Sequence, residues 1–399
     1  MAGKIDNNTS FASRAAHLGR PPVTERTTVN HPVHRASTIL FPSVAEFDRA
    51  YGGMRYEDDN YIYGRLGTPS GNALREAWAD LENGHGAVLT SCGVSAITTA
   101  LWGFLEHGAH LLMTDSVYGP VRTFCDVELR RFGVEVTYYD PTIGAGIASL
   151  LRPATRVIYL ESPGSLTLEV QDVPAITAVA RARGIVTMAD NTWATPYFFR
   201  PLEHGVNVSI QAATKYVGGH SDSMLGIITT DRAHYDAVRR AAVNLGQFAA
   251  ADEIALNLRG LRTLALRLDR HYQTGLRLAG HLHGQPGVRR VIHPALPHDS
   301  GHAVWRRDFD GAPGLFAIIL EPRSREALGA LVDGLRYFGL GVSWGGYESL
   351  VMPANPRSIR TATAWDEAGQ LLRIHAGLEE PQDLMDDLDA GLERYNRMP

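Results

Sequence analysis

Lysine is the residue that this sequence nearly lacks. Lys4 and Lys215 are the only lysines among 38 basic residues, and all the others are arginine. A coding bias towards arginine produces such a ratio without any functional meaning. Arginine, however, keeps its proton and cannot replace an amine that acts as a nucleophile or base. Because Lys4 lies in a polar leader, Lys215 is the candidate for amine chemistry in the body of the chain.

Cysteine and long apolar segments are also scarce. The two cysteines, Cys92 and Cys125, cannot build a disulfide scaffold and suit a reducing compartment. No apolar run approaches the roughly 20 residues of a transmembrane helix. The polar residues 1–13 lack the apolar core of a signal peptide. We therefore expect a cytoplasmic protein with no membrane partner.

No charge of one sign dominates, since 38 basic residues face 43 acidic ones. The resulting net charge of -5 argues against a general nucleic-acid binder. A hydrophobic fraction of 44% and a charged fraction of 20% are typical of a globular protein. At 399 residues, two domains are more plausible than a single large core.

Residues 1–62 have weak periodicity and many proline, asparagine, threonine and glycine residues. A segment so rich in loop-forming residues rarely folds alone. We therefore expect residues 1–62 to form an arm that contacts a neighbouring subunit.

Within residues 63–255, short apolar runs alternate with helical patterns, for example over residues 73–81, 94–106 and 174–183. This alternation indicates an α/β domain, with a mostly parallel sheet between helices and ligands at the carboxyl ends of its strands. The expected strands cover residues 110–114, 134–139, 156–160, 185–188 and 206–210.

Residues 256–399 are expected to form a smaller C-terminal α/β domain. A long helical pattern over residues 251–283, which could divide near Gly275, leads into it. The expected strands cover residues 288–293, 315–320 and 371–374, and the expected helices cover residues 325–338 and 381–395.

Two short motifs suggest other functions but lack the context that they need. Residues 144–149 (GAGIAS) half-resemble a dinucleotide fingerprint, without its third glycine and its later acidic residue. Residues 341–345 (GVSWG) match a serine-hydrolase motif with Ser343 as nucleophile, which requires a helix directly after it. Pro353 and Pro356 disfavour that helix, so a serine hydrolase is a distant alternative. No His/Cys spacing typical of zinc is present, and we expect no metal.

Lys215 and Asp190 each follow an apolar run. Taken singly, Lys215 could be a partly buried lysine paired with an acid, and Asp190 a turn or helix-capping residue. Together they suggest pyridoxal phosphate (PLP). A lysine amine can attach to the aldehyde of this cofactor, while a carboxylate keeps its pyridinium nitrogen protonated.

Two further segments fit this hypothesis. Gly93 and Val94 open an expected helix, whose N-terminal N–H groups could bind a phosphate; the alternative is an ordinary capped helix. Tyr118 follows the strand at residues 110–114, and its ring could stack on a flat cofactor; the alternative is an ordinary loop tyrosine.

Five segments carry a resemblance to a known family: residues 63–69 (YGRLGTP), 161–165 (ESPGS), 190–192 (DNT), 213–216 (ATKY) and 343–349 (SWGGYES). Over nearly the whole chain, the sequence resembles the Cys/Met-metabolism family of PLP enzymes, and most closely its bacterial cystathionine β-lyases.

The resemblance implies an aspartate-aminotransferase-like (fold type I) architecture and a role for each matching residue. Lys215 and Tyr118 would be catalytic. Asp190 would pair with the pyridinium nitrogen. The other implied positions are Gly93, Val94 and Thr214 at the phosphate, Tyr63 and Arg65 reaching the phosphate of the neighbouring subunit, and Arg373, Ser343 and Trp344 at the substrate.

The same resemblance implies a carbon–sulfur lyase acting on a small amino-acid substrate. It would cleave L-cystathionine, or related S-substituted L-cysteines, by α,β-elimination to a thiol such as homocysteine, pyruvate and ammonia. A γ-acting member, such as a cystathionine γ-lyase, methionine γ-lyase or cystathionine γ-synthase, is the alternative. The implied assembly is a homotetramer, formed as a dimer of active dimers.

Overall fold

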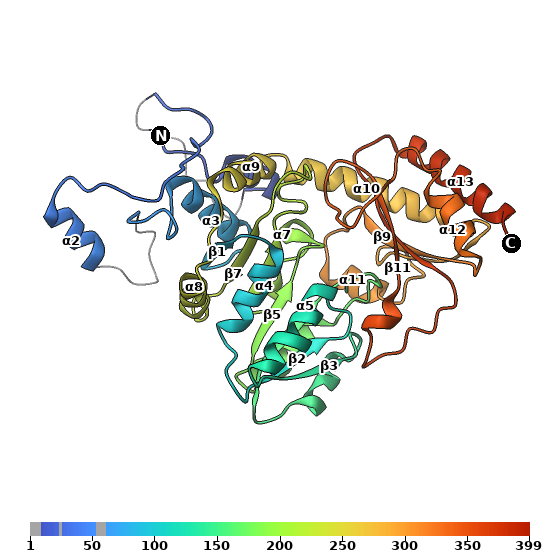
Figure 1. Ribbon diagram of the computed structural model, residues 1–399, viewed down its shortest axis with the longest axis horizontal. Coiled ribbons are helices and arrows are strands. Elements are labelled where there is room, and N and C mark those ends of the chain that lie inside the picture. Colours follow the sequence, from blue (N-terminus) through green and yellow to red (C-terminus); the bar gives the residue numbers. More distant parts are fainter. Residues whose placement is uncertain (1–8, 24–25, 53–60) are drawn as a thin grey trace.

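The computed structural model describes residues 9–23, 26–52 and 61–399. The chain forms two sheets that lie side by side, each with helices around it (Figure 1). The larger sheet has seven strands in the order β1-β7-β6-β5-β4-β2-β3, and the smaller has five in the order β10-β11-β12-β9-β8. The expected α/β class with a mostly parallel large sheet is confirmed.

The larger sheet is parallel from β3 to β6, whereas β7 runs antiparallel to both of its neighbours. The predicted strands are all present, and β1 and β7 were not predicted. The strands are β1 (Gly86–Thr90), β2 (His110–Thr114), β3 (Glu135–Tyr139), β4 (Thr155–Glu161), β5 (Val186–Asp190), β6 (Val208–Ala212) and β7 (Gly226–Thr230).

Both faces of the larger sheet are covered, which explains why its strands form nearly continuous apolar runs. In β2, Leu111 and Met113 pack into one apolar cluster, while Leu112 packs into the other, as the alternation of a strand requires. The helices before and around this sheet are α1 (Phe11–His17), α2 (Val44–Gly52), α3 (Pro69–Leu81), α4 (Gly93–Trp102), α5 (Gly119–Phe124), α6 (Val173–Arg181), α7 (Thr195–Phe198), α8 (Tyr235–Asn244) and α9 (Ala251–Leu261).

The smaller sheet is antiparallel except for the β10–β11 pair. Its strands are β8 (Val288–Ile292), β9 (Leu315–Leu320), β10 (Gly339–Leu340), β11 (Leu350–Ala354) and β12 (Leu371–His375). Its helices are α10 (Leu264–Leu282), α11 (His302–Asp308), α12 (Arg325–Val332) and α13 (Pro381–Arg397).

The expected division of the long helical pattern near Gly275 is wrong. The break falls at residues 262–263, between α9 and α10, and Gly275 lies inside α10. A Cβ on Gly275 would lie 3.0 Å from Gly314 Cα. The glycine therefore allows two backbones to approach closely, and it does not end a helix.

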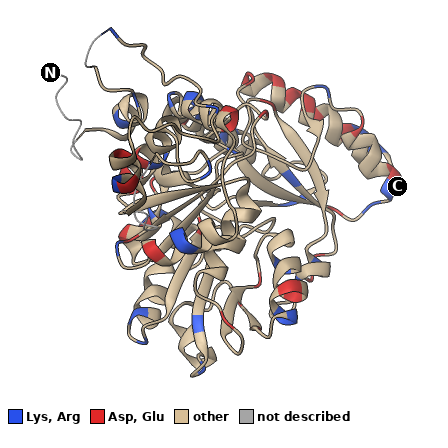
Figure 2. Cartoon of the chain, turned by 60° about the vertical axis from the view of Figure 1, so that its left-hand side comes forward, with Lys and Arg blue, Asp and Glu red and all other residues tan. Residues whose placement is uncertain are grey.

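The surface carries charges of both signs. Lys and Arg are interspersed with Asp and Glu on the face that Figure 2 shows. Among the described residues, no helix is long and apolar enough to cross a membrane.

One buried carboxylate joins the two sheets. Asp115, directly after β2, is fully buried and accepts the N–H groups of Thr361, Ala362 and Thr363 at 2.9–3.2 Å. It also forms an ion pair with Arg122 at 3.1 Å. Burial alone would raise the pKa of Asp115, but these hydrogen bonds more than offset that effect and lower it. The segment before β12 is thereby tied to the loop after β2.

Asp115→Asn tests how much this contact stabilises the protein. The substitution places an N–H₂ group among the donors that now face a carboxylate, so we expect the free energy of unfolding to fall by about 3 kcal/mol near neutral pH. Because the pKa is lowered on folding, the stabilisation should be complete well above pH 3.8 and disappear as the pH falls further. Urea unfolding across pH measures the difference. The same change at exposed Asp333 is the control, and equal stability of both variants would contradict the expectation.

Candidate active site

Lys215 lies in a turn directly after β6, at the edge where the parallel strands end. Its N–H donates to Ala212 O at 3.1 Å. The buried Arg267 of α10 holds the turn, because its guanidinium donates to Tyr216 O at 2.6 Å and to Val217 O at 3.3 Å. The backbone from which the Lys215 side chain projects is therefore fixed both by the end of β6 and by α10.

The Lys215 amine contacts the loop between β10 and β11. Nζ donates to Ser343 Oγ at 2.6 Å and lies 5.1 Å from the centre of the Trp344 ring. Burial, and then the positive charge of Arg373, lowers the pKa of Lys215 to about 8, against the opposing effect of Asp190. A useful fraction of the amine is therefore unprotonated near neutral pH, and this is the form that acts as a nucleophile or base.

Two carboxylates end neighbouring strands beside this amine. Glu161 ends β4, Asp190 ends β5, and the two are partners in the parallel register. Asp190 Oδ1 accepts the Thr192 N–H at 2.9 Å, and Glu161 Oε2 accepts the Tyr118 N–H at 2.8 Å. Burial raises the pKa of Asp190, although the hydrogen bonds from Thr192 and the charge of Lys215 oppose this.

Glu161 is the more perturbed member of the pair. Burial, and then the charge of Asp190, raises its pKa well above the ordinary value. Since neighbouring carboxylates resist ionising together, the arrangement favours a neutral Glu161 beside an ionised Asp190. Glu161 is not among the site residues expected from the sequence. The available signal was its position at the end of an expected strand, at the start of the motif at residues 161–165.

Tyr118 caps the start of α5, and 43% of its surface is exposed. Its loop is held in place by the bond to Glu161 and by the Ser165 N–H, which donates to Ser116 O at 2.8 Å. Burial raises the pKa of Tyr118, while the positive charge of Arg373 opposes it. The ring therefore stands beside both the carboxylate pair and Arg373, where it can contact a ligand.

The start of α4 offers an anion site at the same edge. Within the described residues, the N–H groups of Gly93 and Val94 donate to no protein acceptor. A Cβ on Gly93 would lie 2.6 Å from the Ala212 side chain, so only glycine fits this contact with the end of β6. Thr214 directly precedes Lys215 in the chain, and its Oγ1 accepts the Leu225 N–H at 3.0 Å. Free N–H groups at a helix start attract phosphate.

Arg373 lies in the middle of β12 and reaches the same loop as Lys215. Its Nη2 donates to Val342 O at 2.6 Å and to Ser343 O at 3.0 Å. Burial lowers the pKa of Arg373 to about 10, which still leaves it charged. Within the described residues it forms no ion pair with a carboxylate. Its charge is therefore free to bind the carboxylate of a substrate.

Ser343 does not have the surroundings of a hydrolase nucleophile. Its hydroxyl contacts Lys215, whereas His375 Nε2 accepts the N–H of Gly345 at 3.1 Å. The described residues 341–347 form no helix after the motif. These contacts do not support the serine-hydrolase alternative.

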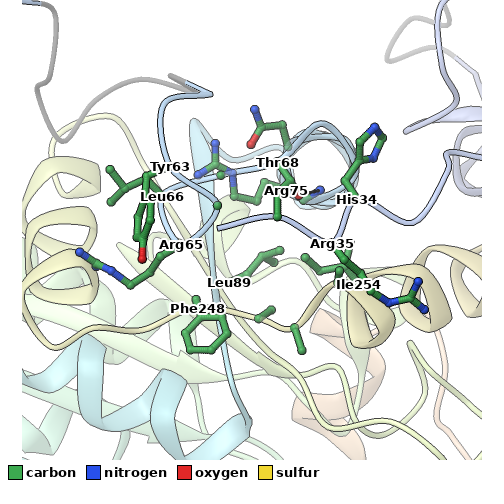
Figure 3. Close-up of a pocket in the computed structure, with 18 of the residues that line it drawn as sticks. His34, Arg35, Tyr63, Arg65, Leu66, Thr68, Arg75, Leu89, Phe248 and Ile254 are labelled. Atoms are coloured by element: carbon green, nitrogen blue, oxygen red, sulfur yellow. Dashed lines mark hydrogen bonds between the residues drawn. The ribbon is translucent and has the colours of Figure 1, made fainter. Parts of the chain in front are cut away.

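Tyr63 and Arg65 lie apart from these residues. They line a cavity of about 430 Å³, whose other lining residues include His34, Arg75 and Phe248 (Figure 3). Arg65 Nη1 donates to Val243 O at 2.9 Å. Of the described residues, neither Lys215 nor Asp190 lines this cavity. The structure thus brings together the other predicted site residues of one chain, but not these two.

The chain was compared with known proteins. Its residues 12–393 match the model of a family described as "Cys/Met metabolism PLP-dependent enzyme". The chain belongs to this family. PLP is therefore its cofactor.

Individual relatives in this family agree over nearly the whole chain. A putative cystathionine β-lyase of Rhizobium johnstonii is 45% identical over 96% of both chains. A cystathionine β-lyase of Escherichia coli is 42% identical over 92% of this chain and 94% of its own. The crystal structure of a cystathionine γ-synthase from Xanthomonas oryzae pv. oryzae has a TM-score of 0.89 and 30% identity, covering 98% of this chain and 100% of that one.

The residues on the edge of the large sheet fit PLP. Bound there, the cofactor withdraws electrons from the Cα of an amino acid. Lys215, an amine with a lowered pKa, would form the covalent attachment, and the Asp190 carboxylate would pair with the pyridinium nitrogen. Gly93, Val94 and Thr214 would hold the phosphate, and the Tyr118 ring would stack on the pyridine. In the described residues, no group of three or more His, Cys, Asp or Glu side chains could hold a metal ion.

Glu161→Gln and Asp190→Asn test the assignment of charge within the carboxylate pair. If Glu161 is neutral, its amide keeps the acceptor for the Tyr118 N–H, so PLP affinity should change by less than about threefold. Removing the charge of Asp190 should lower PLP affinity by about 10- to 100-fold. Absorbance titration of the cofactor-free protein with PLP measures both. Equal losses in the two variants would show that Glu161 is ionised.

Proposed function

We propose that this chain is a PLP-dependent carbon–sulfur lyase. It cleaves L-cystathionine, or related S-substituted L-cysteines, by α,β-elimination and releases a thiol such as homocysteine, pyruvate and ammonia. Two relatives support this proposal: the one at 45% identity is a putative cystathionine β-lyase, and the one at 42% identity is a cystathionine β-lyase.

One geometric observation carries the proposal. Lys215 and Arg373 meet at the same residue, since Lys215 Nζ contacts Ser343 Oγ at 2.6 Å and Arg373 Nη2 contacts Ser343 O at 3.0 Å. An amino acid whose α-carboxylate binds Arg373 would thus have its Cα near the Lys215 amine. With a pKa of about 8, that amine can remove the Cα proton and later return a proton.

The ring of Trp344 limits the space around this amine, since Lys215 Nζ lies 5.1 Å from its centre. Trp344 packs against Tyr216, with ring centres 5.4 Å apart, and is thereby fixed on one side of Lys215. The ring helps to exclude water from the amine. A γ-acting lyase or synthase is the second candidate, because the solved structure with a TM-score of 0.89 is a cystathionine γ-synthase.

Product analysis decides between the two candidates. With L-cystathionine we expect pyruvate and homocysteine in equal amounts, because elimination at Cβ breaks the bond between carbon and sulfur on the cysteine side. Dominant 2-oxobutyrate would instead establish γ-elimination. Mass spectrometry of the products measures the ratio. Lys215→Arg is the control and should lose about 1,000-fold or more of the activity, since a guanidinium cannot replace the amine.

We also propose a homo-oligomer, a dimer of active dimers, whose sites are shared between subunits. Tyr63 and Arg65 would complete the phosphate site of the neighbouring subunit, which accounts for their position in a cavity away from Lys215. The arm supports this proposal, since α2 has no buried residue and projects from the body (Figure 1). Leu40 and Val44 there are 89% and 76% exposed.

The proposed domains follow from this assembly. Residues 1–62, part of which lies outside the described residues, would be the arm between subunits. Residues 63–255 would bind PLP, and residues 256–399 would form the C-terminal domain that carries Arg373. A cytoplasmic location remains a prediction.

Mixing two inactive variants tests whether sites are shared. Lys215→Arg and Arg65→Ala should each inactivate the enzyme. If the sites are shared, the two residues of any one site come from different subunits. Random reassembly of equal amounts should then restore about a quarter of the wild-type activity, because a quarter of the sites combine the two intact residues. The control pair is Lys215→Arg with Asp190→Asn. Both residues come from the same subunit of each proposed site, so every site in a mixed dimer carries one of the two substitutions and no activity should return. Failure of the first pair to recover would rule out shared sites.

A further inference from the structure

The loop that covers Lys215 is held by two side chains of one strand. Arg373 and His375 are two residues apart on β12, so both face the loop at residues 342–346. Arg373 holds the carbonyls of Val342 and Ser343, as described above. His375 holds the next part of the loop, because its Nε2 lies 3.1 Å from Gly345 N.

The segment that His375 holds packs directly on Lys215. Gly345 has a φ of +90°, and a Cβ at this position would lie 3.0 Å from both Cα and Cβ of Lys215. The loop therefore has no room to move towards Lys215. Its position on the other side depends on the hydrogen bond to His375, which links Gly345 to the sheet.

His375 Nε2 contacts two backbone groups of the loop. It lies 3.1 Å from Gly345 N, where it accepts the N–H, and 3.2 Å from Gly346 O, while Nδ1 has no partner among the described residues. His375 is 1% exposed, and the groups packed around it are His271, Tyr216, Arg373 and Lys215. Burial, and then the charges of its neighbours, hold the pKa of His375 well below its ordinary value. The ring therefore stays neutral at working pH, and a neutral ring can accept the Gly345 N–H at Nε2.

We propose that His375 is a positioning residue for the Lys215 amine: by accepting the Gly345 N–H, it fixes the loop that presents Ser343 Oγ and the Trp344 ring to Lys215 and keeps water away. The proposal rests on Lys215 being the reactive amine of the proposed function. His375 itself has no contact with the amine and acts through the loop.

The consequence concerns the titration of Lys215. Without an acceptor at residue 375, the Gly345 N–H would be buried and unpaired, which is costly enough to displace the loop. Water would then reach the amine. Since burial is the largest cause that lowers the pKa of Lys215 from 10.5 to about 8, this pKa should rise when the loop moves away.

Three variants separate the acceptor from the packing of the ring. His375→Phe keeps a ring and removes the acceptor, whereas His375→Gln removes the ring and places an amide oxygen where Nε2 lies. His293→Phe is the matched control. His293 is also fully buried and accepts a backbone N–H, that of Ala295, at 3.1 Å, but lies away from Lys215.

The measurement is the pH profile of amine acetylation at Lys215 in the full-length protein freed of PLP, from about pH 6 to about pH 10. Peptide mass spectrometry resolves this site without ambiguity, because Lys4 is the only other lysine. An added free lysine derivative corrects for the reagent. The variants are compared by the midpoint of the profile and not by the absolute acetylation rate, because a displaced loop also changes the access of the reagent to Lys215.

We expect a midpoint near 8 for the wild type. His375→Phe should raise it by about one pH unit or more, while His375→Gln and His293→Phe should stay within about 0.3 unit of the wild type. A folded His375→Phe with the wild-type midpoint would overturn the proposal. Thermal unfolding checks that each variant is folded. If His375→Phe does not fold, a folded His375→Gln variant with a raised midpoint would also overturn the proposal. This titration contains no substrate, so its result does not depend on lyase activity. A protein without lyase activity would refute the proposed function but would leave the titration result unchanged.

Discussion

A desolvated amine between two sheets is the constraint on which the rest of the site depends. Lys215 comes from the edge of the large sheet, and the residues that exclude water from it, Ser343 and Trp344, come from the small one. Neither sheet could lower the pKa of this amine alone. Contacts that fix the two sheets against each other, such as that of Asp115 with residues 361–363, therefore belong to the chemistry as much as to the stability of the fold.

The parallel register of the large sheet creates the second constraint, which concerns charge. Because β4 and β5 run in the same direction, Glu161 and Asp190 end side by side at one edge. Two carboxylates in such a place cannot both be ionised at little cost, so the fold favours one neutral acid next to one anion. Glu161 holds the loop of Tyr118, and an ionised Asp190 would be the partner of the pyridinium nitrogen in the proposed site.

The small sheet acts on the site through the two alternate residues of β12 that face the loop at residues 342–346. Arg373 holds carbonyl groups of this loop, and His375 accepts an N–H from it, so one cation and one neutral ring together satisfy its backbone. The proposed site for the substrate α-carboxylate, at Arg373, and the proposed positioning of the Lys215 amine, through His375, would thus depend on one strand. A displacement of β12 would change the surroundings of both Arg373 and Lys215.

The sequence by itself determined the α/β class, the central strands, and the two strand ends that carry Asp190 and Lys215. These features are local, because apolar runs and the residues that follow them can be recognised within a few positions. It did not reveal β1, β7, β10 or β11; β1, for example, pairs only with β7, far along the chain. Nor did it reveal the break at residues 262–263, since Gly275 serves a close contact with Gly314. Only the tertiary structure decided that the pKa of Glu161 is raised and that the pKa values of His375 and Lys215 are lowered. Each of these depends on burial and on partners far along the chain, such as Ser343, which lies 128 residues from Lys215.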